Sequence, residues 1–170
     1  DHIEEFVPEG IRLASGRVLE ADVVVTATGL KLLALGGIKP VVDGREVVLA
    51  DEFAWQGTMI SGVPNFALCI GYTNASWTLR GDLNTRLLCK ILATMRADGA
   101  AAVVPVPDPD LERVPLLGLR SGYILRSLHE FPSQGDRAPW KVRQNYPIDA
   151  ATTMRYDLRR TLSFLRRGEP

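Results

Sequence analysis

The sequence is poor in cysteine and histidine. Only Cys69 and Cys89 stand in 170 residues, which is too few for the disulfide framework of a small secreted domain. Each lies in an apolar run, where a reduced thiol behaves as a small hydrophobic side chain, so we expect burial of both and a reducing, cytoplasmic location. The only histidines are His2 and His129. Neither has a second His or Cys at ligand spacing, so we expect no metal site.

An excess of charge and long hydrophobic runs are also absent. Twenty Lys and Arg balance twenty Asp and Glu, so bulk electrostatics indicate neither nucleic acid nor an anionic membrane as a partner. No stretch reaches the roughly 18 apolar residues that a membrane span needs, and we recognise no charged-then-apolar leader. The last twenty residues hold five arginines against two acidic residues, which we interpret as a solvated tail.

The first seventy residues predict strands and turns. The segments HIEEF and IRLAS predict two strands joined by the turn VPEG, with a second turn at SGR. ADVVVTATG, residues 21–29, predicts a strand buried on both faces, because consecutive valines are typical of parallel sheets. Asp43-Gly44 predicts a hairpin. FALCI, residues 66–70, predicts a second buried strand after the turn GVPN.

The rest of the chain begins with a helical pattern. Apolar residues recur every four positions over residues 75–96, which predicts a long helix ended by Asp98-Gly99. Its predicted core face carries Leu79, Leu83, Leu87, Ile91 and Met95. Four prolines at residues 105–115 predict an extended surface connection. SGYILRSLHEF predicts a short helix, PSQGDRAPW a loop, and residues 149–165 mixed structure.

The turn GYTNASWT, residues 71–78, lies between the second buried strand and the long helix. That edge of an open α/β sheet binds ligands, and the first amides of a helix lack intrahelical partners and carry partial positive charge. Thr73, Asn74 or Ser76 can cap one of these donors. Two interpretations stay open here. Either the helix is capped and Trp77 packs into the core, or the turn holds a planar or anionic group such as a flavin edge.

Other residues also leave two interpretations open. The small residues after the first buried strand fit either a plain tight turn or a close backbone approach to a ligand. A Ser-His-Asp triad can be drawn on paper, yet no serine stands on a strained elbow after a strand. Its members would be Ser127 or Ser133, His129 and Asp136. Three aromatic residues fit either a substrate entrance or packing: Trp55, Trp140 and Tyr146.

Three stretches resemble flavoproteins with two dinucleotide-binding domains. EADVVVTATGL is similar to the Asp-(apolar)-Ala-Thr-Gly segment that ends the nicotinamide domain in that superfamily. GVPNFALCIGYTNASWTLRGDL resembles the strand and flavin-facing helix of the flavin-containing and Baeyer–Villiger monooxygenases. SGYILRSLHEFPSQGDRAPWKVRQNY is similar to the C-terminal portion of their ethionamide-activating branch. The resemblance runs from about residue 3 to about residue 147.

The resemblance implies an α/β fold, the C-terminal part of a Rossmann-like FAD/NAD(P)-binding flavoprotein with an N-terminal β-rich segment and a long helix. It implies that residues 1–30 end an NADPH-binding domain, residues 31–100 hold the return segment and the C-terminal part of an FAD-binding domain, and residues 101–170 form an extension packed on the FAD domain. The implied cofactor-binding residues are Ala27, Thr28 and Gly29 at the domain passage, and Gly71, Tyr72, Thr73, Asn74, Ala75, Ser76 and Trp77 beside the flavin.

The implied activity is FAD- and NADPH-dependent transfer of one oxygen atom from dioxygen to a ketone or a soft N or S substrate. No Gly-x-Gly-x-x-Gly loop, which cradles pyrophosphate, occurs in these residues. The family fingerprint and its oxygen-supporting arginine also lack a match, so no catalytic residue is assigned. We expect the N-terminal part of the same enzyme to be a required partner. Two alternatives stay open: another two-domain flavoprotein, such as a reductase or amine oxidase, or a non-catalytic interaction domain that docks through residues 105–115.

Overall fold

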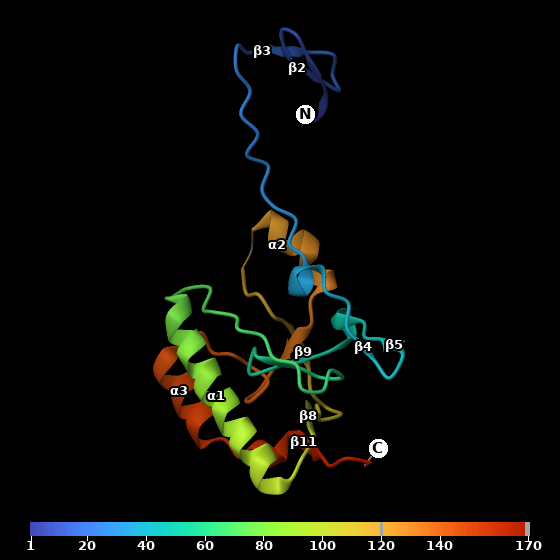
Figure 1. Ribbon diagram of the computed structural model, residues 1–170. Helices are drawn as coiled ribbons and strands as arrows, with labels where there is room; N and C mark the ends of the chain where they lie inside the picture. Colours follow the sequence, from blue (N-terminus) through green and yellow to red (C-terminus); the bar gives the residue numbers. More distant parts are fainter. Residues whose placement is uncertain (120, 169–170) are drawn as a thin grey trace. The chain divides into compact units, whose positions relative to one another are not determined.

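The computed structural model describes residues 1–119 and 121–168 (Figure 1). The chain divides into two compact units, Asp1–Leu30 and Lys31–Pro170. Helices and strands both occur, as the sequence predicts. Among the described residues, no helix is long and apolar enough to cross a membrane.

The first unit is a three-stranded antiparallel meander. Its strands are β1 (Ile3–Val7), β2 (Gly10–Leu13) and β3 (Val18–Glu20), which pair in that order. Gly10 is required where β2 begins, since its φ is 147° and an added Cβ would lie 2.0 Å from the Leu19 carbonyl oxygen. The two predicted strands at the start of the chain and both turns are confirmed.

The predicted strand within ADVVVTATG is wrong. Residues 21–30 form neither helix nor strand, and Val23 and Val25 are 76% and 82% exposed. An apolar run of this kind is buried only where neighbouring strands flank it and other layers cover both faces. In the part of the chain that the structure describes, no strand pairs with these residues.

The second unit combines helices with short strand pairs (Figure 1). Its helices are α1 (Trp77–Asp98), α2 (Gly122–Ser127) and α3 (Tyr146–Arg155). Single 3-10 turns are η1 (Ala34–Gly37), η2 (Leu49–Asp51), η3 (Leu128–Glu130) and η4 (Leu158–Arg160). The antiparallel pairs are β4 (Val41–Val42) with β5 (Arg45–Glu46), β6 (Ala54–Trp55) with β7 (Met59–Ile60), β8 (Ala102–Pro105) with β11 (Leu162–Leu165), and β9 (Arg113–Pro115) with β10 (Ser133–Gly135). The predicted hairpin is the β4–β5 turn, where Asp43 and Gly44 both have positive φ.

Helix α1 confirms the predicted long helix with a shift of two residues. Leu83, Leu87 and Ile91 are buried, whereas Leu79, at the exposed start of the helix, is 41% exposed. Gly99 ends the helix in the left-handed conformation with a φ of 66°, as expected for a C-terminal glycine.

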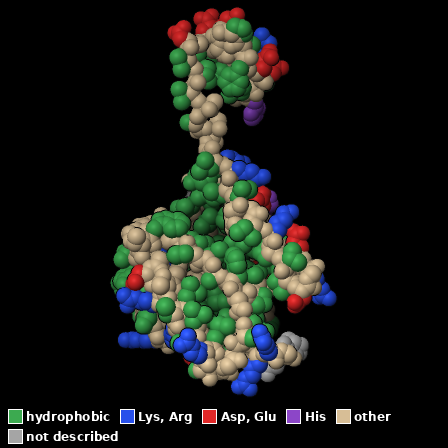
Figure 2. Space-filling view, in the orientation of Figure 1, with side chains coloured by type: hydrophobic (Ala, Val, Ile, Leu, Met, Phe, Trp, Pro, Cys, Tyr) green, Lys and Arg blue, Asp and Glu red, His purple; other side chains and the backbone are tan. Residues whose placement is uncertain are grey.

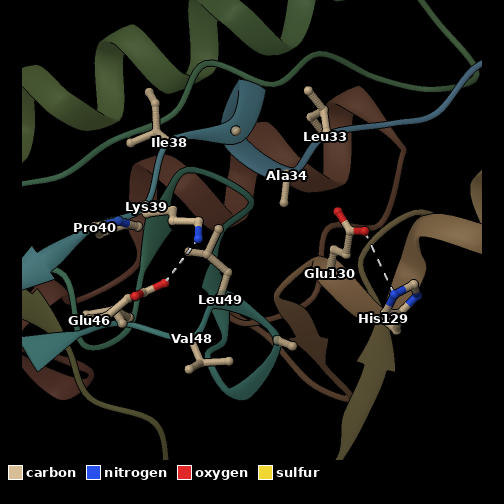
Figure 3. Close-up of a pocket in the computed structure, with 13 residues that line it drawn as sticks. Leu33, Ala34, Ile38, Lys39, Pro40, Glu46, Val48, Leu49, His129 and Glu130 are labelled. Atoms are coloured by element: carbon tan, nitrogen blue, oxygen red, sulfur yellow. Dashed lines mark ion pairs between the residues drawn. The ribbon is translucent and has the colours of Figure 1, made fainter.

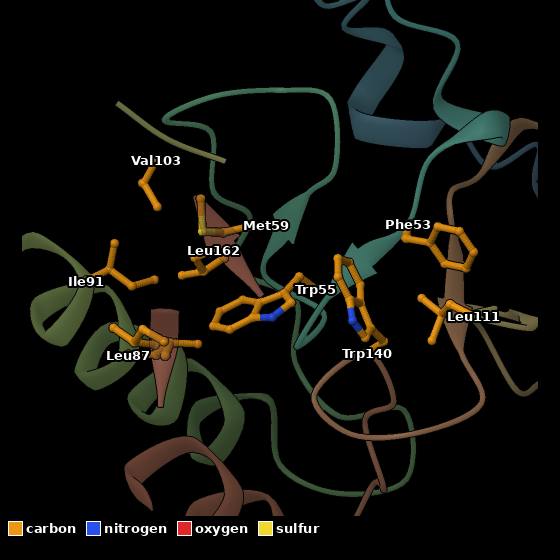
Figure 4. Packing of buried hydrophobic residues seen from close by; sticks show 10 residues of the cluster. Phe53, Trp55, Met59, Leu87, Ile91, Val103, Leu111, Trp140 and Leu162 are labelled. Atoms are coloured by element: carbon orange, nitrogen blue, oxygen red, sulfur yellow. The ribbon is translucent and has the colours of Figure 1, made fainter. Parts of the chain in front are cut away.

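Two tryptophans organise the core that lies between α1 and the strands (Figure 4). Trp55 and Trp140 are fully buried. Trp140 meets Phe53 edge to face, with ring centroids 5.9 Å apart, and Trp55 Nε1 donates to Thr161 Oγ1 at 2.8 Å. Both tryptophans therefore serve packing, and a substrate entrance lined by them is wrong. Tyr146 instead begins α3 and is 37% exposed.

The end of the chain is built into the fold rather than forming a solvated tail. Strand β11 pairs with β8, and its Leu162 is buried. Arg159 binds both carboxylate oxygens of Asp98 at 2.8 Å, close to the end of α1. Pro105, predicted in a surface connection, is buried within β8. PSQGDRAPW likewise contributes β10 and is only partly a loop.

Residues 66–70 do not form the predicted strand buried on both faces. A single bridge, Met59 to Ala67, joins this segment to β7 among the described residues. Phe66 and Leu68 pack on the cluster around Ile60, while Ala67 and Cys69 are exposed. Cys89 is a free, exposed thiol as well, so the predicted burial of both cysteines is also wrong.

Candidate functional site

The turn of residues 71–76 leads into α1 with its outer part open to solvent. Gly71 and Tyr72 are buried, whereas residues 73–79 are exposed. Trp77 is 62% exposed, so its packing into the core is wrong. A Cβ on Gly71 would lie 2.3 Å from the Trp77 ring. Only glycine therefore lets this indole lie directly against the backbone of the turn.

The start of α1 keeps its amide donors free of a side-chain cap. Ser76 occupies the N-cap position but accepts no capping hydrogen bond, and its Oγ lies 2.7 Å from Thr78 Oγ1. The first amides of a 22-residue helix thus face outward from exposed residues. Such amides carry partial positive charge and suit an anionic or electron-rich group.

Gln144 fixes the turn from outside the helix. Its Oε1 accepts from the Thr73 amide at 3.0 Å, and its backbone oxygen accepts from Asn74 Nδ2 at 3.3 Å. Gln144 holds a positive φ of 56° while doing so. Thr73 and Asn74 therefore shape the turn and do not cap the helix.

Tyr72 anchors the inner side of the turn to the start of α3. Its hydroxyl donates to Asp149 Oδ2 at 2.9 Å, and the two side chains are 1% and 4% exposed. Asp149 also accepts from the amides of Arg143 at 3.0 Å and Asn145 at 3.3 Å. One buried carboxylate therefore ties the turn to the segment that precedes α3.

Buried polar residues support the first turns of α1. Arg80 is 3% exposed and donates to the backbone oxygen of Gln56. Asn84 Oδ1 accepts from Thr58 Oγ1 at 2.9 Å, and its Nδ2 donates to the Ile70 oxygen at 3.2 Å. These contacts fix the helix axis, and Arg80 places a full positive charge one turn inside the exposed N-terminus.

The Tyr72 phenol has a distinct ionisation. Burial, and then the hydrogen bond to Asp149, raise its pKa to about 12. Because the folded-state pKa lies above the unfolded value of 10, the stabilisation is complete below pH 10 and is lost as the pH rises through about 12. Between pH 9 and pH 11.5, this loss amounts to about 2 kcal/mol.

The variant Tyr72→Phe should therefore show a smaller alkaline loss of stability than the parent chain. Urea unfolding at pH 9 and pH 11.5 measures the difference, which we expect to be about 2 kcal/mol. Absorbance titration at 295 nm should lose one phenol that ionises near pH 12. Parallel pH profiles of the two proteins would contradict this account of Tyr72.

The residues that hold the turn were not predicted from the sequence as a group. Gln144 was noticed only as part of the stretch QNY, and Asp149 and Arg80 were not singled out. One local signal was available: Asn145 is the N-cap of α3, accepts from the Ile148 amide at 3.3 Å, and is followed by an early proline. Asn and Pro in these positions are typical of a helix start.

Ala27, Thr28 and Gly29 belong to the first unit. All three are exposed and lie in its irregular C-terminal stretch, where Gly29 has a φ of 89°. A positive φ at Gly29 agrees with a backbone turn that favours glycine. Their role toward a cofactor stays a prediction.

A second concave region lies away from the turn, in the second unit (Figure 3). Its volume is about 410 Å³, and its lining is mainly apolar: Leu33, Ala34, Gly37, Ile38, Pro40, Val47, Val48, Leu49 and Ala50, with Lys39, Glu46, His129 and Glu130. His129 Nε2 lies 3.8 Å from Glu130 Oε1. Ser127 Oγ donates to the Tyr123 oxygen at 3.1 Å, so this serine is engaged by its own helix rather than by a triad.

No group of three or more His, Cys, Asp or Glu side chains able to hold a metal ion occurs among residues 1–119 and 121–168. The donor set at the start of α1 consists of amides, a hydroxyl pair and a buried guanidinium. These groups fit the electron-rich edge of a planar cofactor by their chemistry.

Comparison with known proteins gives relatives over most of the chain. It is 47% identical over 150 residues to the FAD-containing monooxygenase EthA of Mycobacterium tuberculosis, 88% of this chain. It is 44% identical over 161 residues, or 92% of the chain, to the probable FAD-binding monooxygenase AlmA of Acinetobacter baylyi. It is 41% identical over 152 residues to the putative FAD-containing monooxygenase MymA of Mycobacterium tuberculosis, again 88% of the chain.

The chain spans about a third of the length of these curated relatives, 31% to 32% of each. No family profile matches the sequence, and no solved structure matches it.

Proposed function

We propose that this chain, which is related in sequence to the FAD-containing monooxygenases over nearly its whole length, forms the C-terminal third of such an enzyme. The complete enzyme would have the Rossmann-like, two-dinucleotide-binding-domain fold. Residues 1–30 would end its NADPH-binding domain, residues 31–100 would return to the FAD-binding domain, and residues 101–170 would pack on that domain. The observation that carries this proposal is an identity of 41% to 47% over 88% to 92% of the chain.

The site that we assign to FAD is the start of α1. Its exposed amides would face the pyrimidine side of the flavin ring, where reduction places negative charge, and the helix terminus would stabilise that charge. Bound FAD would supply hydride acceptance from NADPH and the activation of dioxygen. The contribution of Gly71, Trp77 and the residues between them is orientation and charge complementarity.

The residues beneath the turn would hold it in one conformation. Gln144 fixes its outer side, and Asp149 fixes its inner side through Tyr72. A preorganised turn loses little entropy when it binds a rigid ring. Arg80, one turn further along α1, would add positive charge behind the amides. Ala27, Thr28 and Gly29 would shape the passage between the two cofactor domains.

The reaction we propose consumes an organic substrate, dioxygen and NADPH. One oxygen atom would enter a ketone or a soft N or S centre, the other would leave as water, and NADPH with one proton would supply the two electrons and hydrogens required. Two free thiols, Cys69 and Cys89, suit a reducing cytoplasm, which is where we place the enzyme.

Oxygen consumption by the full-length enzyme tests this function. With NADPH and a cyclic ketone or a thioether, we expect substrate-dependent oxygen uptake and a product 16 mass units heavier, with the label derived from ¹⁸O₂. NADPH oxidation without labelled product, or a purified protein without flavin, would overturn the proposal. Trp77→Ala and Ser76→Pro should lower flavin content or flavin reduction, whereas Arg96→Ala, at the exposed far end of α1, serves as the matched control.

A further inference from the structure

We propose that one side of the second unit is an open edge that receives an apolar β-strand from another part of the enzyme polypeptide. The open edge consists of Ala67, Cys69, Leu88, Leu92 and Met95, from residues 66–70 and α1. The inference rests on the proposed function, in which this chain is one part of a longer enzyme. It adds to that function the surface through which the two parts join.

The backbone of residues 66–70 is paired along only one edge. The Leu68 amide donates to the Thr58 oxygen at 2.6 Å, and Met59 forms its bridge with Ala67. Because backbone groups alternate along an extended chain, those of Ala67 and Cys69 point away from β7. Across the described ranges, no strand lies on that second edge. It therefore presents unpaired donors and acceptors to a partner.

The adjoining side of α1 is apolar and under-covered. Leu92 is 63% exposed, and Leu88 and Met95 are half-buried. A Cβ on Gly81 would lie 3.7 Å from Cys69 Sγ, which places this side of the helix directly over the unpaired edge. An apolar hollow of about 350 Å³ continues the surface and is lined by Met59, Asn65, Ala67, Leu88, Ile91, Leu92, Met95 and Val103.

The chemistry of the open edge points to one kind of partner. None of its members is charged, and hydrophobic side chains reach the surface of the second unit widely (Figure 2). FALCI has the composition of a strand that is buried on both faces, and an exposed edge of this kind invites pairing with another strand. The relatives are about three times as long as this chain, so a partner strand within the same polypeptide is available.

Alkylation of Cys69 tests the docking directly. In the 170-residue chain, iodoacetamide should modify Cys69 rapidly, because the thiol is free and exposed. In the full-length enzyme, we expect at least a tenfold slower reaction at Cys69, followed by peptide mass spectrometry. Arg86→Cys in a Cys89→Ser background gives a matched reporter on another side of α1, and its rate should be equal in both proteins. Equal rates at Cys69 in the two proteins would overturn the proposal.

A charge placed on the open edge gives a second measurement. Ala67→Lys should leave the melting temperature of the 170-residue chain unchanged, because Ala67 is exposed there, yet it should reduce the soluble yield or melting temperature of the full-length enzyme. Equal effects in both proteins would contradict the docking. If Ala67→Lys instead dissolves a dimer of the short chain while Cys69 stays reactive in the full-length enzyme, the edge binds a second copy and the proposal is wrong.

Flavin content and oxygen uptake separate this inference from the proposed function. A protected Cys69 in a full-length protein without flavin or monooxygenase activity would overturn the function alone. A reactive Cys69 in an active flavoprotein would overturn the docking alone.

Discussion

The 170-residue chain by itself should bind FAD weakly and oxidise no NADPH. The only cofactor contacts that it offers are the exposed amides at the start of α1 and the small residues 27–29. A dinucleotide is normally anchored through its pyrophosphate by a Gly-rich loop at a helix start, and no Gly-x-Gly-x-x-Gly occurs in this sequence. Without that anchor, the ring contacts must overcome the whole cost of immobilising the cofactor.

Titration of free FAD into the isolated chain, followed by flavin fluorescence, measures this effect. We expect no saturation up to roughly 100 µM, which corresponds to a binding free energy weaker than about −5.5 kcal/mol. The full-length enzyme, purified in parallel, should retain its flavin through gel filtration. Micromolar or tighter binding by the isolated chain would contradict the prediction, and NADPH oxidation by that chain would contradict it more strongly.

Replacing Asp149 with leucine should destabilise the chain by about 3 to 5 kcal/mol. Its carboxylate is 4% exposed and accepts hydrogen bonds from the Tyr72 hydroxyl and from two backbone amides. Asp149→Leu leaves three donors without partners in a buried place, and each such group costs about 1 to 3 kcal/mol. In the full-length enzyme, the turn that we assign to FAD should lose its anchor, so flavin content should fall as well.

Three variants calibrate that measurement. Asp149→Asn keeps the shape and one acceptor oxygen and should lose less stability than Asp149→Leu. Tyr72→Phe removes a single hydrogen bond, worth about 1 kcal/mol. Asp82→Ala, which breaks an exposed ion pair with Arg86 on α1, should change stability by less than about 1 kcal/mol. Urea unfolding that places Asp149→Leu within 1 kcal/mol of the parent chain would show that this carboxylate is not the anchor of the turn.

The accuracy of the sequence-based predictions depended on the range of the interactions involved. Helix α1, the Asp43-Gly44 hairpin and the turns of the first unit are confirmed, because spacing, glycine and Asx chemistry act within a few residues. The strands at residues 21–29 and 66–70 are wrong as buried strands, since burial needs flanking strands that these residues do not find in this chain. The expected burial of Cys69 and Cys89 failed for the same reason.

The sequence by itself determined where α1 begins and ends, which amides it exposes, and the relation to flavoproteins. Only the tertiary structure decided how the turn is held. Gln144 and Asp149 lie 71 and 77 positions from their partners Thr73 and Tyr72, and no local pattern encodes such pairs. The physical reason is that helix periodicity and turn chemistry are properties of neighbouring residues, whereas hydrogen bonds between distant segments form only after the core around Trp55 and Trp140 has brought those segments together.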